Sequence, residues 1–117
     1  MESENYETLV PHLVEAIPEV PFDPDDVADR RTYLVFNDLM RFVVSSIDAG
    51  KTETLERIFR FIEAAAQTND LRVEDVLQDA FYHVAVAPKE TTERAKNSMG
   101  PRTQKLFRRV EAQIYQR

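Results

Sequence analysis

Apolar residues recur at helical spacing along most of this sequence, in blocks separated by proline, glycine and short polar runs. A recurrence at i, i+3, i+4 and i+7 places side chains on one face of an α-helix. Five blocks follow this pattern, at residues 6–17, 31–47, 52–67, 73–84 and 106–114. No stretch alternates like a β-strand for more than a few residues, and the chain has only two glycines, so helices are the expected secondary structure.

The ends of these blocks carry typical helix-boundary residues. Pro18 and Pro21 end the first block, Gly50 follows the second, and Asp70 precedes the fourth as its predicted N-cap. Pro11 lies inside the first block and would cost an interior hydrogen bond there. The first helix therefore either kinks at this proline or begins near it.

Two segments lack the helical pattern. Residues 18–29 hold three prolines and four aspartates and are interpreted as a loop, and residues 89–99 as a weak helix or an ordered loop. We predict an all-α fold with a single domain over residues 1–117, built as a compact bundle of five to six helices. Stacked helical hairpins would explain the paired blocks, with the third and fourth helices as a tight antiparallel pair.

Charge is sorted by position along the chain. Residues 1–29 carry nine carboxylates and no Lys or Arg, whereas residues 89–117 carry eight basic and three acidic residues, within a net charge of −6. The acidic end can attract a basic partner, or it can pair with the basic end within the molecule. For the basic residues of the last helix, pairing with the acidic end within the molecule is the simpler interpretation.

The acidic segment supplies the predicted partner-binding residues, which are carboxylates in or beside the loop at 18–29. They are Glu15, Glu19, Asp23, Asp25, Asp26 and Asp29. The alternative is a solvated turn in which an aspartate caps the next helix. No metal or cofactor is predicted, because the run lacks the glycine and the terminal glutamate of a calcium-binding loop.

Residues with catalytic potential are scattered. His12 and His83 lie far apart without a second ligand nearby, and we interpret both as structural. Ser45 and Ser46 lack the glycine-flanked elbow of a hydrolase nucleophile, and Glu63 is expected to face water. No catalytic residue is predicted, and we expect a protein without enzymatic activity.

Nucleic acid and membranes are not the expected partners. A basic stripe on the last helix, at Arg102, Lys105, Arg108 and Arg109, has no second basic element to support phosphate binding. No apolar stretch approaches the roughly 18 residues that a membrane span needs. With no cysteine and no leader-like segment at the N-terminus, the sequence favours a cytoplasmic location.

Several phrases of the sequence, each a packing pattern, together resemble a known family. They are the opening at 6–18 and the segments 34–42, 55–63 and 99–103. The chain is similar over residues 6–111 to small all-helical bacterial proteins classed as a domain of unknown function. The resemblance implies a context like that of the immunity proteins that accompany bacterial polymorphic or contact-delivered toxins. Residues 79–84 depart from it, since similar proteins tend to have a Phe-Leu-Glu-like phrase there.

We therefore predict a protein–protein interaction module with a basic protein partner, which under the resemblance is a toxin bound by its immunity protein. The alternative is a structural module that forms homo-oligomers. It would self-associate through an exposed apolar helix face made of Leu106, Phe107, Val110 and Ile114.

Overall fold

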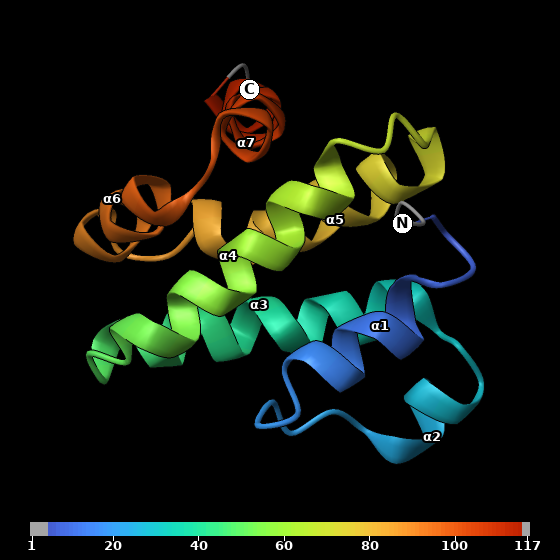
Figure 1. Cartoon of the computed structure of the whole chain (residues 1–117). Coiled ribbons are helices and arrows are strands. Elements are labelled where there is room, and N and C mark those ends of the chain that lie inside the picture. The colour runs from blue at the N-terminus through green and yellow to red at the C-terminus, as the bar shows by residue number, and fades with distance from the viewer. Residues whose placement is uncertain (1–4, 116–117) are drawn as a thin grey trace.

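The computed structural model describes residues 5–115, and these form seven helices and no strand (Figure 1). The helices are α1 (Leu9–Ala16), α2 (Pro24–Ala28), α3 (Thr32–Asp48), α4 (Thr52–Ala66), α5 (Leu71–Ala85), α6 (Lys89–Ser98) and α7 (Pro101–Tyr115). The predicted all-α class is confirmed. The predicted number of five to six helices is wrong by one, because the segment interpreted as a loop contains α2.

Helix α2 forms from local capping rather than from an apolar stripe. The Asp23 side chain accepts hydrogen bonds from the backbone N–H groups of Asp25 and Asp26, at 2.8 and 3.4 Å. Pro24 occupies the first helical position, where its missing N–H costs nothing. A five-residue helix thus needs no buried residue of its own.

Two other ambiguous segments have a definite structure. Helix α1 begins at Leu9, so Pro11 lies in the first turn, where backbone N–H groups have no intrahelical acceptor anyway. Residues 89–98 form α6, which docks through polar contacts. The Thr92 hydroxyl donates to the Val84 carbonyl at 2.8 Å, and the Thr91 hydroxyl donates to Asp48 at 3.3 Å.

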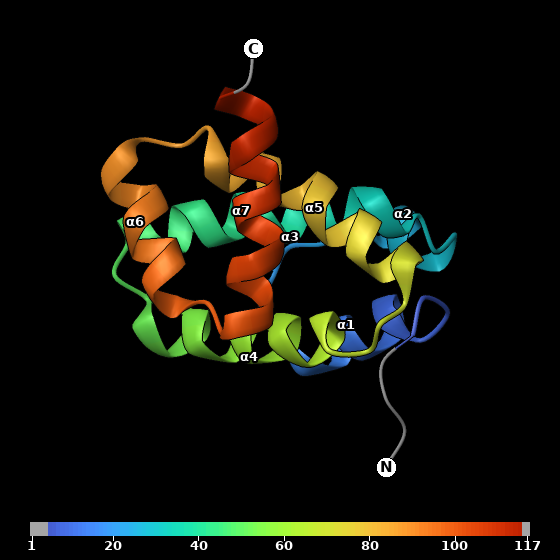
Figure 2. The same cartoon turned by 90° about the horizontal axis from the view of Figure 1, so that it is seen from above.

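The centre of the fold is the pair α3 and α5, which lie side by side and run in the same direction (Figures 1 and 2). Helix α4 runs antiparallel to α5, as predicted, but α5 packs more extensively on α3 than on α4. The core residues of the central pair are fully buried: Val35, Phe36, Leu39, Met40 and Val43 from α3, and Val73, Val76, Leu77, Ala80, Phe81 and Val84 from α5.

Helix α7 crosses α5 and covers it (Figure 2). Its residues Leu106, Phe107 and Val110 are buried, and the Phe107 ring meets the Phe81 ring edge-on at a centroid distance of 5.9 Å. Ile114 is partly buried against the same core. The predicted self-association face is therefore wrong, because this apolar stripe packs inside the protein.

The hydroxyl of Ser46 is buried in α3 and has no hydrogen-bond partner among residues 5–115. Replacing Ser46 with alanine should raise the free energy of unfolding by about 1 kcal/mol, since a buried unsatisfied polar group is removed. Urea denaturation measures this change. Ser45→Ala is the matched control, because the Ser45 hydroxyl is exposed and donates to the Phe42 carbonyl. A loss of stability in Ser46→Ala would contradict the prediction.

Candidate functional site

Most of the predicted partner-binding carboxylates have partners within the chain. Glu19 is paired with the Arg57 guanidinium of α4, which lowers the pKa of this carboxyl group. Asp23 caps α2. Arg31 lies between Asp26 and Asp29 and contacts them at 3.1 and 3.2 Å. Three of these four carboxylates therefore stabilise the acidic segment locally, and Glu19 ties it to α4.

The remaining two predicted residues are Glu15 on α1 and Asp25 on α2. Both side chains are exposed, and neither has a hydrogen bond or ion pair to another residue in the range 5–115. The structure therefore leaves two of the six carboxylates without a partner in this part of the chain, one on each of two short helices.

The expected pairing between the acidic and basic ends is not present among the described residues. The carboxylates near the N-terminus pair with arginines from the middle of the chain: Arg31, Arg57 and Arg72. In α7, Arg109 contacts Glu74 at 3.4 Å, and Arg102 approaches the same carboxylate at 3.9 Å. Two members of the basic stripe thus help to anchor α7 on α5.

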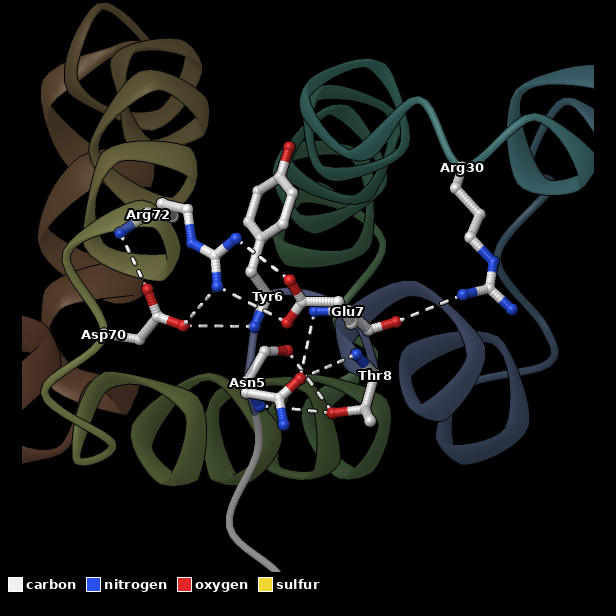
Figure 3. A network of polar contacts seen from close by, with 7 residues as sticks. All are labelled: Asn5, Tyr6, Glu7, Thr8, Arg30, Asp70 and Arg72. Atoms are coloured by element: carbon white, nitrogen blue, oxygen red, sulfur yellow. Dashed lines mark hydrogen bonds and ion pairs between the residues drawn. The ribbon is translucent and has the colours of Figure 1, made fainter.

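Arg72 is the centre of a network that ties the N-terminal segment to α5 (Figure 3). Its guanidinium donates to both carboxylate oxygens of Glu7, at 2.9 and 3.4 Å, and lies 4.9 Å from the centroid of the Tyr6 ring. Asp70 accepts from the backbone N–H groups of Tyr6 and Arg72. An arginine is thus held between one aromatic ring and two carboxylates.

Glu63 is half-buried and contacts α7, so the prediction that it faces water is wrong. Its carboxylate accepts from the backbone N–H groups of Arg102 and Thr103, at 3.2 and 2.9 Å, and from the Thr103 hydroxyl at 2.9 Å. Burial raises the pKa of Glu63, but the hydrogen bonds from Thr103, Gln67 and Arg102 outweigh it, so the pKa is lowered. A side chain of α4 therefore caps the N-terminus of α7 from across the fold.

A hollow of about 320 Å³ lies between α5 and α7. Helix α5 contributes polar and aromatic side chains, and α7 contributes apolar ones and one amide; the lining residues are Asp75, Gln78, Asp79, Tyr82, Val110, Gln113 and Ile114. Asp75 and Asp79 are exposed and have no ion pair with any Lys or Arg in the described range. The Tyr82 side chain is half exposed, at 50%.

Neighbouring residues of α3 extend this surface. Asn37 donates to Asp79 at 3.2 Å, and its amide oxygen lies 2.7 Å from Nε2 of His83. Because the Asn37 oxygen accepts, Nε2 of His83 carries the proton. Burial raises the pKa of Tyr33, and the nearby charges of Asp75 and Asp79 add to that effect. We call the surface formed by Tyr33, Asn37, Asp75, Asp79 and Tyr82 the acidic tyrosine face.

The acidic tyrosine face was not predicted. Residues 75, 78, 79 and 82 share one side of a helix, opposite its apolar stripe, and such a polar stripe is usually a solvated surface. Only the approach of α7 turns this polar stripe into the wall of a hollow.

Within residues 5–115, no group of three or more His, Asp or Glu residues is arranged to hold a metal ion, and no helix is long and apolar enough to cross a membrane.

A family model described as a domain of unknown function (DUF7674) matches residues 10–116. The chain belongs to this family. No curated protein and no solved structure matches the chain. The predicted membership of an uncharacterised family is thus confirmed, whereas the bacterial source and the immunity role stay predictions. The DUF7674 match includes the acidic tyrosine face and both free carboxylates at 15 and 25, and it begins after Tyr6 and Glu7 of the Arg72 network.

Proposed function

We propose that this DUF7674 domain binds a basic protein, and that the acidic tyrosine face is its docking surface. The observation that carries the proposal is the pair Asp75 and Asp79, which line a hollow without a cationic partner in the described range. Four of the six predicted carboxylates are instead engaged within the chain. Unpaired carboxylates favour a partner of opposite charge and speed its association.

The aromatic residues of the same face support a protein partner. Tyr33 and Tyr82 are 41% and 50% exposed. Tyrosine is enriched at protein interfaces because it offers a large, rigid apolar ring together with a hydroxyl. An acidic surface with exposed tyrosines therefore fits a protein better than a small anion or a nucleic acid, which the carboxylates would repel.

The immunity role implied by the family resemblance is one form of this function. A toxin that acts on nucleic acid needs a cationic surface to bind phosphates, and an acidic surface could occlude it by charge complementarity. Under this proposal Asp75, Asp79, Tyr33 and Tyr82 make the contact. Glu15 and Asp25 would then contribute to long-range attraction rather than to contact.

Capture of partners from the source cell's lysate tests the proposal. The tagged wild-type protein is compared with the double variant Asp75→Lys, Asp79→Lys and with the control Glu15→Lys, Asp25→Lys, which changes net charge equally. We expect a basic protein on the wild type, released as salt rises and absent from the first variant but retained by the control. Circular dichroism checks that both variants fold. Loss of the partner in the control alone would return the site to the acidic segment at 15–29.

A further inference from the structure

We infer that the hollow between α5 and α7 receives an arginine side chain of the partner, stacked on Tyr82 and bound by Asp75 and Asp79. This inference rests on the proposed function, because it names the chemical group by which the basic partner is recognised. It concerns the individual hollow rather than the whole acidic tyrosine face. It can therefore fail while the face still binds a protein.

The hollow has the size and lining of a side-chain pocket. Its volume of about 320 Å³ is at the small end of the range of ligand pockets, which is roughly 300–1,000 Å³. Val110 and Ile114 of α7 supply an apolar wall, against which the methylene groups of a long side chain could pack. Asp75 and Asp79 lie one helical turn apart, so their carboxylates border the same opening.

The position of Asp79 is held from outside the hollow. The Asn37 amide donates to Asp79 Oδ2 at 3.2 Å and also to the Tyr33 carbonyl at 2.7 Å. A carboxylate has several acceptor positions, so this bond leaves room for a further donor. Asp79 is thus oriented in advance for a cation, which lowers the entropy cost of binding.

The protein already contains one arginine site made of the same chemical groups. At the N-terminal network, Arg72 lies over the Tyr6 ring at 4.9 Å and is bound by Glu7 and Asp70 (Figure 3). The hollow offers one tyrosine and two carboxylates as well, but no guanidinium from the described residues fills it. The Arg72 site, which forms within the chain, shows how one tyrosine and two carboxylates accommodate an arginine side chain.

Arginine fits this set better than lysine does. A guanidinium is planar, so it can stack on a ring while its N–H groups, which point in several directions, donate to two carboxylates. A lysine ammonium is a compact, strongly hydrated charge, and it gains less from an aromatic face at an exposed site. The hollow should therefore discriminate between peptides of equal charge.

The test is a titration of the ¹⁵N-labelled full chain, at low salt, with the capped tripeptides Gly-Arg-Gly and Gly-Lys-Gly. We expect amide shift changes concentrated at residues 75–82 and 110–114, with the arginine peptide binding about two- to fivefold more tightly. Tyr82→Ala, and Asp79→Asn separately, should each weaken the arginine peptide by about two- to fivefold. The double variant Glu15→Gln, Asp25→Asn is the control: it loses two negative charges, one more than Asp79→Asn, and should still leave the affinity for the arginine peptide unchanged.

Three outcomes would overturn the inference. They are shift changes spread evenly over the acidic surface, equal affinity for the two peptides, and an affinity unaffected by both Tyr82→Ala and Asp79→Asn. If the peptide fails in one of these ways while the Asp75/Asp79 charge reversal still abolishes partner capture, the proposed function stands and the arginine pocket falls. If the peptide binds as expected and the charge reversal leaves capture intact, the proposed function fails at this face while the pocket remains.

Discussion

Replacement of Phe81 by alanine is expected to lower the free energy of unfolding by about 3–5 kcal/mol. The Phe81 side chain is fully buried in α5, at 0% exposure, and its ring meets Phe107 of α7 edge-on. Truncation removes that contact and leaves a cavity where the central helix pair joins α7. Such a loss is a large part of the stability of a domain of this size, so chemical denaturation should show a strongly reduced midpoint.

The neighbouring residue provides the control for this prediction. Tyr82 lies on the same helix but is half exposed, so Tyr82→Ala should change the free energy of unfolding by less than about 1 kcal/mol. The two variants together separate the core of α5 from its proposed binding surface. Similar losses in both variants would mean that the face carrying Tyr82 is also a packing surface.

Replacement of Glu63 by alanine is expected to lower the free energy of unfolding by about 2–3 kcal/mol, although the residue is only half-buried. The variant removes the acceptor for two backbone N–H groups at the start of α7 and for the hydroxyl of Thr103, which is completely buried. Urea denaturation at pH 7 measures the loss. Glu56→Ala, at an exposed position on the same helix, is the matched control and should stay close to wild type.

The charge of Glu63 adds a pH dependence with a defined sign. In the folded protein the pKa of Glu63 lies below its ordinary value of 4.5. Ionisation of Glu63 therefore stabilises the fold above pH 4.5, and this contribution is lost as the pH falls through the pKa of the folded protein. The stability difference between wild type and Glu63→Gln should therefore be largest near neutral pH and shrink below pH 4.5. A difference that grows on acidification would contradict the assigned role.

A close contact at Gly100 supports the same role for Glu63. A Cβ atom added at Gly100 would lie 2.5 Å from the carboxylate carbon of Glu63. Because that carboxylate is held by the first turn of α7, Gly100→Ala should displace it and reproduce part of the loss seen in Glu63→Ala. The glycine therefore permits the close approach of the cap.

Helix positions were largely predictable because their signals are local. The apolar spacing located α3, α4, α5 and α7, and Asp70 was identified in advance as the N-cap of α5. The apolar spacing does not predict α2, because the signal for this helix is a cap followed by a proline, without any apolar stripe. The sequence leaves the start of α1 open, because a proline is compatible with the first turn of a helix but not with an interior one.

The fate of individual charges was not predictable in the same way. Glu63 meets Arg102 and Thr103 at sequence separations of 39 and 40 residues, and Glu19 meets Arg57 at a separation of 38. Composition identified an acidic end and a basic end, but it could not say which carboxylates find cations nearby. Among the described residues, neither end pairs with the other. The acidic end pairs with arginines from the middle of the chain, and the basic end pairs with Glu74 and with carboxylates of its own segment.

From its sequence alone this protein is recognisable as an all-helical member of an uncharacterised family with an acidic N-terminal region. The helices depend on residues within a few helical turns of one another, and the charge layout can be read along the chain without knowledge of the packing. The parallel pairing of α3 with α5, the cap of α7 by Glu63, and the hollow at Asp75, Asp79 and Tyr82 arise only when distant helices meet. Helix periodicity states which face is buried, whereas the partner that covers that face is set by packing across the whole chain.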